Sequence, residues 1–164
     1  MTVSALDVID ALRRTGHKIA TAESLTGGLL CATLVDVPGA SDVVCGGVVA
    51  YTPQVKIDML GVSGEVLAEH GSVHDVTAVQ MAWGAVEQVS GATLGISTTG
   101  VAGPDASEGV AVGTVYVAIA DSHDATVHDF HFEGDRRSIR EQTVDAALSL
   151  LIGRLGESTE ANHG

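Results

Sequence analysis

The spacing of apolar residues divides the chain into helical segments and strands. Residues 3–14 have apolar side chains mostly at helical spacing, and Gly16 follows them as a stop signal. Residues 75–89 continue this spacing over a longer stretch, with Val76, Val79, Trp83 and Val86 on one stripe. The segments that we predict as helices are 3–14, 29–35, 54–60, 63–71, 75–89 and 135–155.

Shorter apolar runs between these segments predict strands at 18–22, 43–51, 92–98, 112–120 and 125–132. The second run, VVCGGVVAY, predicts a strand buried on both faces. The last two runs are joined by a short polar turn, which predicts an antiparallel hairpin. Strands interleaved with helices indicate an α/β protein, a three-layer α/β/α sandwich with a mixed, mostly parallel sheet carrying a C-terminal antiparallel hairpin. We expect one domain at residues 1–156 and a mobile tail at 157–164.

The composition narrows the possible partners. Hydrophobic residues make up 45% of the 164 residues, but aromatic residues only 3%, so the core must consist of Val, Leu, Ile and Ala. No apolar run approaches the roughly 20 residues of a membrane span, and the chain is expected to be soluble and cytoplasmic. The net charge of −13 repels nucleic acid and anionic membranes, so neither is an expected partner. Cys31 and Cys45 lack CxxC spacing and are expected to be ordinary buried thiols.

One stretch, TAESLTGG at residues 21–28, lies between a predicted strand and a predicted helix. Such a turn leaves backbone N–H groups without partners at the positive end of the helix dipole. Ser24 in this turn can be a nucleophile with an oxyanion stabiliser beside it. Alternatively, Ser24 or Thr26 merely caps the helix, which is the commoner use of these residues.

Three further segments contain candidate chemistry. Lys56 follows the strand that ends at Tyr51, and it can act as a base if burial lowers its pKa; a solvated lysine is the ordinary alternative. Thr99 begins a tight loop at 99–105, at the strand end where α/β proteins place ligands. Arg136 and Arg140 share a helical face and can clamp an anion, although surface ion pairs explain them equally well. The histidines lack proper ligand spacing, and no metal site is expected.

Taken together, these segments resemble the CinA C-terminal domain family, the nicotinamide-mononucleotide (NMN) amidohydrolases. The order and spacing of the matching motifs span nearly the whole chain, which is more specific than any single motif. The matching positions are TAESLTGG at 21–28, PGAS at 38–41, Gly47, Tyr51, Lys56, LGV at 60–62, GVAGPD at 100–105, VGTV at 112–115, GDR at 134–136 and Arg140.

The resemblance implies hydrolysis of the carboxamide of NMN to nicotinate mononucleotide and ammonia, without a cofactor or metal. It implies Ser24 as nucleophile and Lys56 as its base, with N–H groups around residues 25–28 stabilising the oxyanion. Tyr51 and Thr99 are expected to relay or orient the proton. The substrate-binding candidates are Thr26, Gly27, Gly28, Gly100, Gly103, Arg136 and Arg140. The chain is expected to be the stand-alone form and a homo-oligomer.

Two positions depart from the family pattern. Leu25 stands where relatives often have cysteine, and the loop after Asp105 reads ASEGVA, which is shorter and less glycine-rich than in many members. The second departure bears on how the loop fits a substrate. Two other functions remain open at this point, namely a catalytically silent nucleotide-binding module and an amidohydrolase for another pyridine or amino-acid carboxamide.

Overall fold

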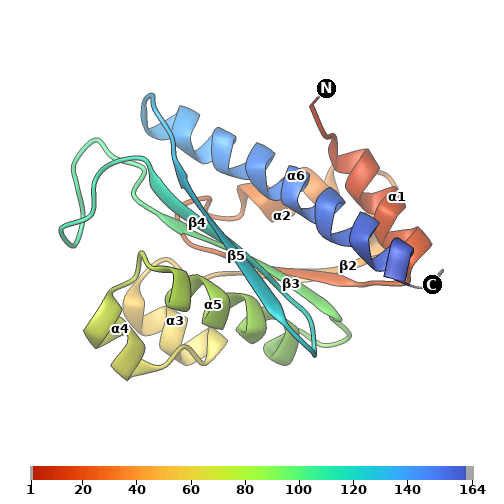
Figure 1. Cartoon of the computed structure of the whole chain (residues 1–164), viewed down its shortest axis with the longest axis horizontal. Helices are drawn as coiled ribbons and strands as arrows, with labels where there is room; N and C mark the ends of the chain where they lie inside the picture. The colour runs from red at the N-terminus through yellow and green to blue at the C-terminus, as the bar shows by residue number, and fades with distance from the viewer. Residues whose placement is uncertain (1, 162–164) are drawn as a thin grey trace.

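The structure, a computed structural model, describes residues 2–161, with side chains described through residue 157. These residues form a five-stranded sheet between two layers of helices (Figure 1). The strands are β1 (Ile19–Glu23), β2 (Val44–Val49), β3 (Leu94–Gly100), β4 (Thr114–Ala120) and β5 (Ala125–His131). The helices are α1 (Ala5–Thr15), α2 (Leu29–Val35), α3 (Pro53–Leu60), α4 (Gly64–His70), α5 (Asp75–Gln88) and α6 (Arg136–Ala161), with a 3-10 turn, η1, at Ala40–Asp42.

The strand order in the sheet is β2-β1-β3-β4-β5. Strand β1 pairs in parallel with both β2 and β3, whereas β4 runs antiparallel to β3 and to β5. The predicted mixed sheet with a C-terminal antiparallel hairpin is therefore confirmed. The carboxyl ends of β1, β2 and β3 meet at one edge of the sheet, and the connections that leave these strands lie side by side there.

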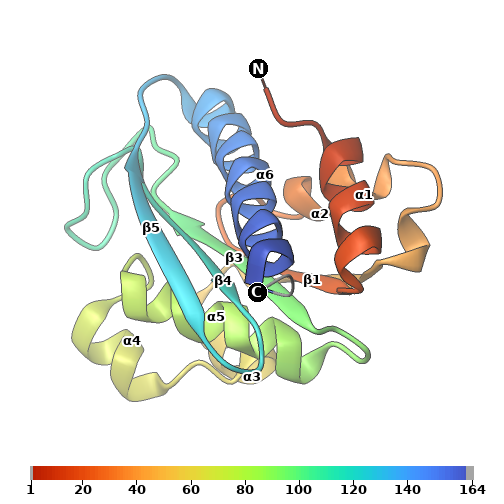
Figure 2. The ribbon, with the colours of Figure 1, turned by 45° about the vertical axis from the view of Figure 1, so that its right-hand side comes forward.

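Helices α1, α2 and α6 cover one face of the sheet, and α3, α4 and α5 cover the other (Figures 1 and 2). Each face has its own core: Leu12, Ile96 and Leu151 are buried on the first, and Leu60 and Met81 on the second. Burying aliphatic side chains of this kind is the main stabilising contribution to a layered α/β fold. Among the described helices, none is both long and apolar enough to cross a bilayer.

Local signals in the sequence explain how α3 begins and ends. The Thr52 hydroxyl accepts the N–H of Val55, Pro53 occupies the first turn, and Gly61 ends the helix in the left-handed conformation with φ +69°. Helix α3 therefore begins immediately after the end of β2. This places Lys56 in its first turn, with the side chain directed into the protein.

One prediction about burial is wrong. Strand β2 is not buried on both faces, because it is the edge strand of the sheet, and Val49 is 48% exposed. In α5, Trp83 is 42% exposed, whereas Val79 on the same stripe packs against the core. The buried face of α5 instead carries small residues and Met81, and a methyl group on Gly95 of β3 would overlap the helix backbone. Small side chains allow helix and sheet to approach closely.

The final helix is longer than predicted. Helix α6 continues to Ala161, so residues 157–161, which were expected to belong to a mobile tail, have helical backbone. The rest of the expected tail, residues 162–164, lies outside the described residues.

Candidate active site

The turn after β1 is held between the two neighbouring parallel strands. The N–H of Ser24 donates to the carbonyl of Thr98 on β3 at 2.9 Å, and the N–H of Ala50 after β2 donates to the carbonyl of Glu23 at 2.9 Å. These two bonds extend the sheet pairing by one residue beyond β1. Ser24 is therefore fixed between β2 and β3 at the edge where all three strands end, and it is 7% exposed.

The positive end of α2 is occupied by a carboxylate of the protein itself. Glu23 is 1% exposed, and its two oxygens accept four hydrogen bonds at 2.7–3.1 Å. The donors are the hydroxyls of Thr21 and Thr26 and the N–H groups of Leu30 and Cys31. A buried carboxylate needs such donors, and the helix N-terminus supplies two of them. Glu23 thus takes the capping role that the sequence suggested for Ser24 or Thr26, and Ser24 is left free.

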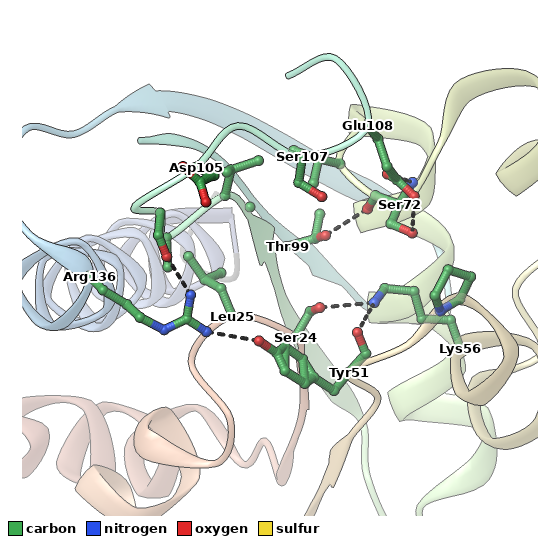
Figure 3. A pocket seen from close by; sticks show the side chains of 16 residues that line it. Ser24, Leu25, Tyr51, Lys56, Ser72, Thr99, Asp105, Ser107, Glu108 and Arg136 are labelled. Carbon is green, nitrogen blue, oxygen red and sulfur yellow. Dashed lines mark hydrogen bonds between the residues drawn. The ribbon is translucent and has the colours of Figure 1, made fainter. Parts of the chain in front are cut away.

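Ser24 and Lys56 are brought together by the fold although 32 residues separate them (Figure 3). Lys56 Nζ lies 2.8 Å from Ser24 Oγ, 2.8 Å from the carbonyl oxygen of Ala50 and 3.4 Å from that of Tyr51. Carbonyl oxygens only accept hydrogen bonds, so the amine directs N–H groups at both of them. In neutral Lys56 the remaining tetrahedral position is a lone pair, and it is directed at the Ser24 hydroxyl.

The surroundings of Lys56 favour its neutral form. The side chain is fully buried, and this burial lowers the pKa of Lys56 to about 8, while the charge of Glu108 acts in the opposite direction. A substantial fraction of the amine is therefore unprotonated just above neutral pH. An amine with a pKa near the working pH, in hydrogen-bond contact with a hydroxyl, is suited to act as a general base.

Backbone donors remain beside Ser24. The N–H of Gly27 is used, because it donates to the carbonyl of Ser24 at 3.1 Å. The N–H groups of Leu25 and Thr26 have no hydrogen-bond acceptor among the described residues. Of the oxyanion donors expected at residues 25–28, Leu25 is the one that also lines the pocket.

Tyr51 does not have the geometry of a proton relay. Its hydroxyl accepts a hydrogen bond from Arg136 Nη2 at 2.8 Å, and its ring is 56% exposed (Figure 3). Only its backbone carbonyl contacts Lys56. The other terminal nitrogen of Arg136, Nη1, donates to the carbonyl of Gly103 at 2.6 Å. Arg136 therefore links the Tyr51 side chain to the 100–105 loop. Both side chains line the pocket in front of Ser24.

Several expected substrate contacts are structural instead. Arg140 donates to the carbonyls of Leu25 and Thr26 at 2.9 and 3.0 Å, which holds the serine turn against α6. Thr26 is fully buried and bonds to Glu23. Of the described residues, Thr26, Gly27, Gly28 and Arg140 are not among those lining the pocket, whereas Gly100, Gly103 and Arg136 are.

The pocket in front of Ser24 has a volume of about 230 Å³. Thr99 lines it, but its hydroxyl donates to the carbonyl of Ser72 at 2.6 Å rather than to Lys56. Ser72 in turn donates its N–H and hydroxyl to the Glu108 carboxylate, at 2.9 and 3.2 Å. Sequence reasoning missed Ser72 and Glu108, because they lie in polar connections 36 residues apart with no local pattern that joins them. No group of three or more potential metal ligands occurs among the described residues.

The fold and this site together define an α/β protein with a buried serine–lysine pair at the carboxyl ends of its parallel strands. The sequence model of the CinA C-terminal domain matches residues 2–155. The chain belongs to the CinA C-terminal domain family.

Curated relatives agree with this family. The chain is 49% identical over 135 residues to a putative competence-damage inducible protein of Desulforamulus reducens, which covers 82% of this chain and 33% of that protein. It is 43% identical over 142 residues to the protein of the same description in Bacillus subtilis, covering 87% of this chain and 34% of that protein. The chain therefore spans about a third of the length of these relatives.

Solved structures match over nearly the full chain. The competence/damage inducible protein CihA of Agrobacterium tumefaciens is 38% identical, with a TM-score of 0.87 and 93% of each chain covered. A CinA superfamily protein of Klebsiella pneumoniae is 32% identical, with a TM-score of 0.88, covering 92% of this chain and 94% of that chain.

Proposed function

We propose that this protein is an amidohydrolase that converts NMN to nicotinate mononucleotide and ammonia. The observation that carries the proposal is the 2.8 Å contact between Ser24 Oγ and the buried Lys56 Nζ. The choice of NMN comes from the family resemblance, and the reaction class comes from the site. A serine beside a lysine of lowered pKa, followed by an amide N–H that has no acceptor in the described part of the chain, is the arrangement that acyl transfer requires.

In the first half of the reaction, Ser24 Oγ attacks the carboxamide carbon while its proton passes to neutral Lys56. The developing oxyanion is stabilised by the N–H of Leu25, a residue that lines the pocket and whose N–H has no hydrogen-bond acceptor among the described residues. The C–N bond then breaks, and Lys56 returns the proton to the departing nitrogen, which leaves as ammonia. An ester between Ser24 and the nicotinoyl group remains.

In the second half, water takes the place of ammonia. Lys56 accepts a proton from this water, and the hydroxide attacks the ester carbon through a second oxyanion at the same Leu25 amide. Ser24 Oγ leaves with the proton held by Lys56, and the carboxylic acid that forms is released as nicotinate after its proton passes to solvent. Lys56 is thus neutral at the start of each half-reaction, which links activity to its lowered pKa.

The pocket suits the carboxamide end of the substrate. Its volume of about 230 Å³ is below the roughly 300–1,000 Å³ of pockets that enclose a drug-sized ligand, so we expect the nicotinamide ring inside and the phosphate near the rim. Arg136 lines this pocket, and in a chain with a net charge of −13 it is the guanidinium available there for the phosphate.

The proposal is tested by measuring ammonia release by the purified protein from NMN, nicotinamide riboside, nicotinamide and glutamine. We expect release from NMN with a kcat/KM at least about tenfold above that for nicotinamide, because only the nucleotide reaches Arg136. Preference for another carboxamide would retain the reaction class but contradict the substrate. Binding of NMN in a calorimeter without ammonia release from any compound would instead identify a silent nucleotide-binding module.

A further inference from the structure

Glu108 lies in the loop between β3 and β4, and its backbone conformation is unusual. With φ +52°, it is the only residue other than glycine that has a positive φ among the described residues. This conformation is unfavourable for a non-glycine residue, because Cβ comes too close to the following carbonyl oxygen. Gly109, which would adopt it freely, is the next residue and also has a positive φ. A side chain kept at this position therefore has contacts that offset the cost.

These contacts join two connections on opposite sides of the pocket. The Glu108 carboxylate accepts the N–H of Ser72 at 2.9 Å and its hydroxyl at 3.2 Å. Ser72 also accepts the hydroxyl of Thr99 through its carbonyl, at 2.6 Å. Ser107 and Val110 form a bridge across the turn that presents Glu108. The loop is thus fastened to the α4–α5 connection over the pocket (Figure 3).

The same carboxylate acts on Lys56. Burial lowers the pKa of Lys56, and the charge of Glu108 raises it. The other charged or titratable side chains lining the pocket are Tyr51, Asp105 and Arg136, of which Arg136 and Tyr51 bond to each other. His70 at the end of α4 stacks on His74 at the start of α5, with 4.3 Å between the ring centroids, and His74 Nδ1 lies 2.8 Å from Asp75 Oδ1.

We propose that Glu108 is a positioning residue of this site: it fastens the loop over the pocket to Ser72 and sets a fixed negative charge facing Lys56. The loop that carries it is the segment in which this chain departs from the family pattern, ASEGVA. The role rests on the proposed function insofar as Ser24 and Lys56 act as nucleophile and base.

A nucleotide-independent probe separates this role from the choice of substrate. Phenylmethanesulfonyl fluoride labels an activated serine: Ser24 Oγ displaces fluoride from sulfur while its proton passes to Lys56. The labelling rate is measured from pH 7 to pH 10, above the ordinary pKa of histidine near 6.5. Glu108→Gln keeps the contact, because its amide oxygen accepts the Ser72 N–H and its amide group donates to the hydroxyl, but it removes the charge.

In Glu108→Gln we expect the labelling rate to begin rising at a lower pH than in the wild type. Without the negative charge of Glu108, a larger fraction of Lys56 is neutral at a given pH. Each rate at pH 7 is divided by the plateau rate of the same protein at alkaline pH. This ratio should be about 1.5-fold to fivefold higher in Glu108→Gln than in the wild type, which is the range for exposed ion pairs worth about 0.2–1 kcal/mol. Asp129→Asn is the matched control, since it removes an exposed charge from β5, outside the pocket lining, and it should match the wild type. If the pH profile of Glu108→Gln coincides with those of the wild type and Asp129→Asn, the proposal is overturned.

The fastening is tested with Glu108→Ala, which removes both hydrogen bonds as well as the charge. Its KM for NMN should increase by at least about threefold over that of Glu108→Gln, because the loop over the pocket is no longer tied to Ser72. Equal KM values in the two variants would overturn this part. If the wild type labels as expected but releases no ammonia from NMN, the proposed substrate fails, whereas the role of Glu108 is still decided by the labelling profiles.

Discussion

The amine of Lys56 is buried in an environment that disfavours its charged, ammonium form. Burial lowers the pKa of Lys56 from an ordinary 10.5 to about 8, against the opposing charge of Glu108. Below pH 8 the folded protein therefore contains a buried ammonium group that the unfolded chain would expose to water. The difference between the two pKa values corresponds to about 3 kcal/mol of unfolding free energy.

The sign of the effect follows from proton binding. Between about pH 8 and pH 10.5 the unfolded chain holds the Lys56 proton more tightly than the folded protein does, so stability rises with pH in this window. The variant Lys56→Met has nothing to titrate at this position. We expect the stability of the wild type relative to Lys56→Met to increase by about 3 kcal/mol from pH 7 to pH 10.5. The hydrogen bonds of Lys56 that are lost in Lys56→Met change the free energy of unfolding by an amount that does not depend on pH.

The assay is urea unfolding of both proteins at half-unit intervals over this pH range. Lys18 provides the matched control, because it is the only other lysine in the sequence and is exposed. The variant Lys18→Met should follow the wild type at every pH. If Lys56→Met and the wild type change in parallel with pH, Lys56 titrates like an ordinary lysine in the folded protein, and the reasoning for a neutral base near pH 8 is refuted.

Two further substitutions test the framework of the site by urea unfolding. Glu23→Gln should lower the free energy of unfolding by about 1–3 kcal/mol, because an amide group would face N–H and hydroxyl donors inside the protein; unchanged stability would contradict the capping role. Gly84→Ala should cost about 1–3 kcal/mol, since its methyl would overlap the carbonyl that ends α3, whereas Gly153→Ala in α6 meets nothing and should stabilise by roughly 0.4–1 kcal/mol. Equal stability of these two glycine variants would contradict the close packing of α5 on α3.

Elements with local signals were predictable from the sequence. The Ser63 hydroxyl caps α4 by accepting the N–H of Val66, and α3 follows directly from Thr52 and Pro53. These signals lie within one helical turn of the elements they define. The two short helices therefore match their predicted positions to within a residue at each end.

Burial was less predictable because it depends on the partner surface. Trp83 is the largest apolar side chain of α5, yet it is 42% exposed. What decides the packing is close approach: Ala78 and Ala82 are fully buried against the sheet, where larger side chains would not fit. Hydrophobicity along one segment contains no information about the space that the facing element leaves.

The site was predictable only in part, and for a similar reason. Nothing local joins Ser24 to Lys56, and only the family resemblance predicted that folding brings them together. Glu23 stands next to Ser24 in the sequence, yet its role depends on α2 turning back so that its first N–H groups meet the carboxylate. The contact of Glu108 with Ser72 joins loops far apart in the chain, which no periodicity encodes.

The most direct test of the account is the rate of ammonia release from NMN by Ser24→Ala at pH 8.5, compared with the wild type at equal concentration. The wild type should produce ammonia and nicotinate mononucleotide in equal amounts. Ser24→Ala, with an unfolding free energy close to that of the wild type, should be slower by at least about 1,000-fold, because the attacking oxygen is gone. A rate within tenfold of the wild type would show that Ser24 is not the nucleophile.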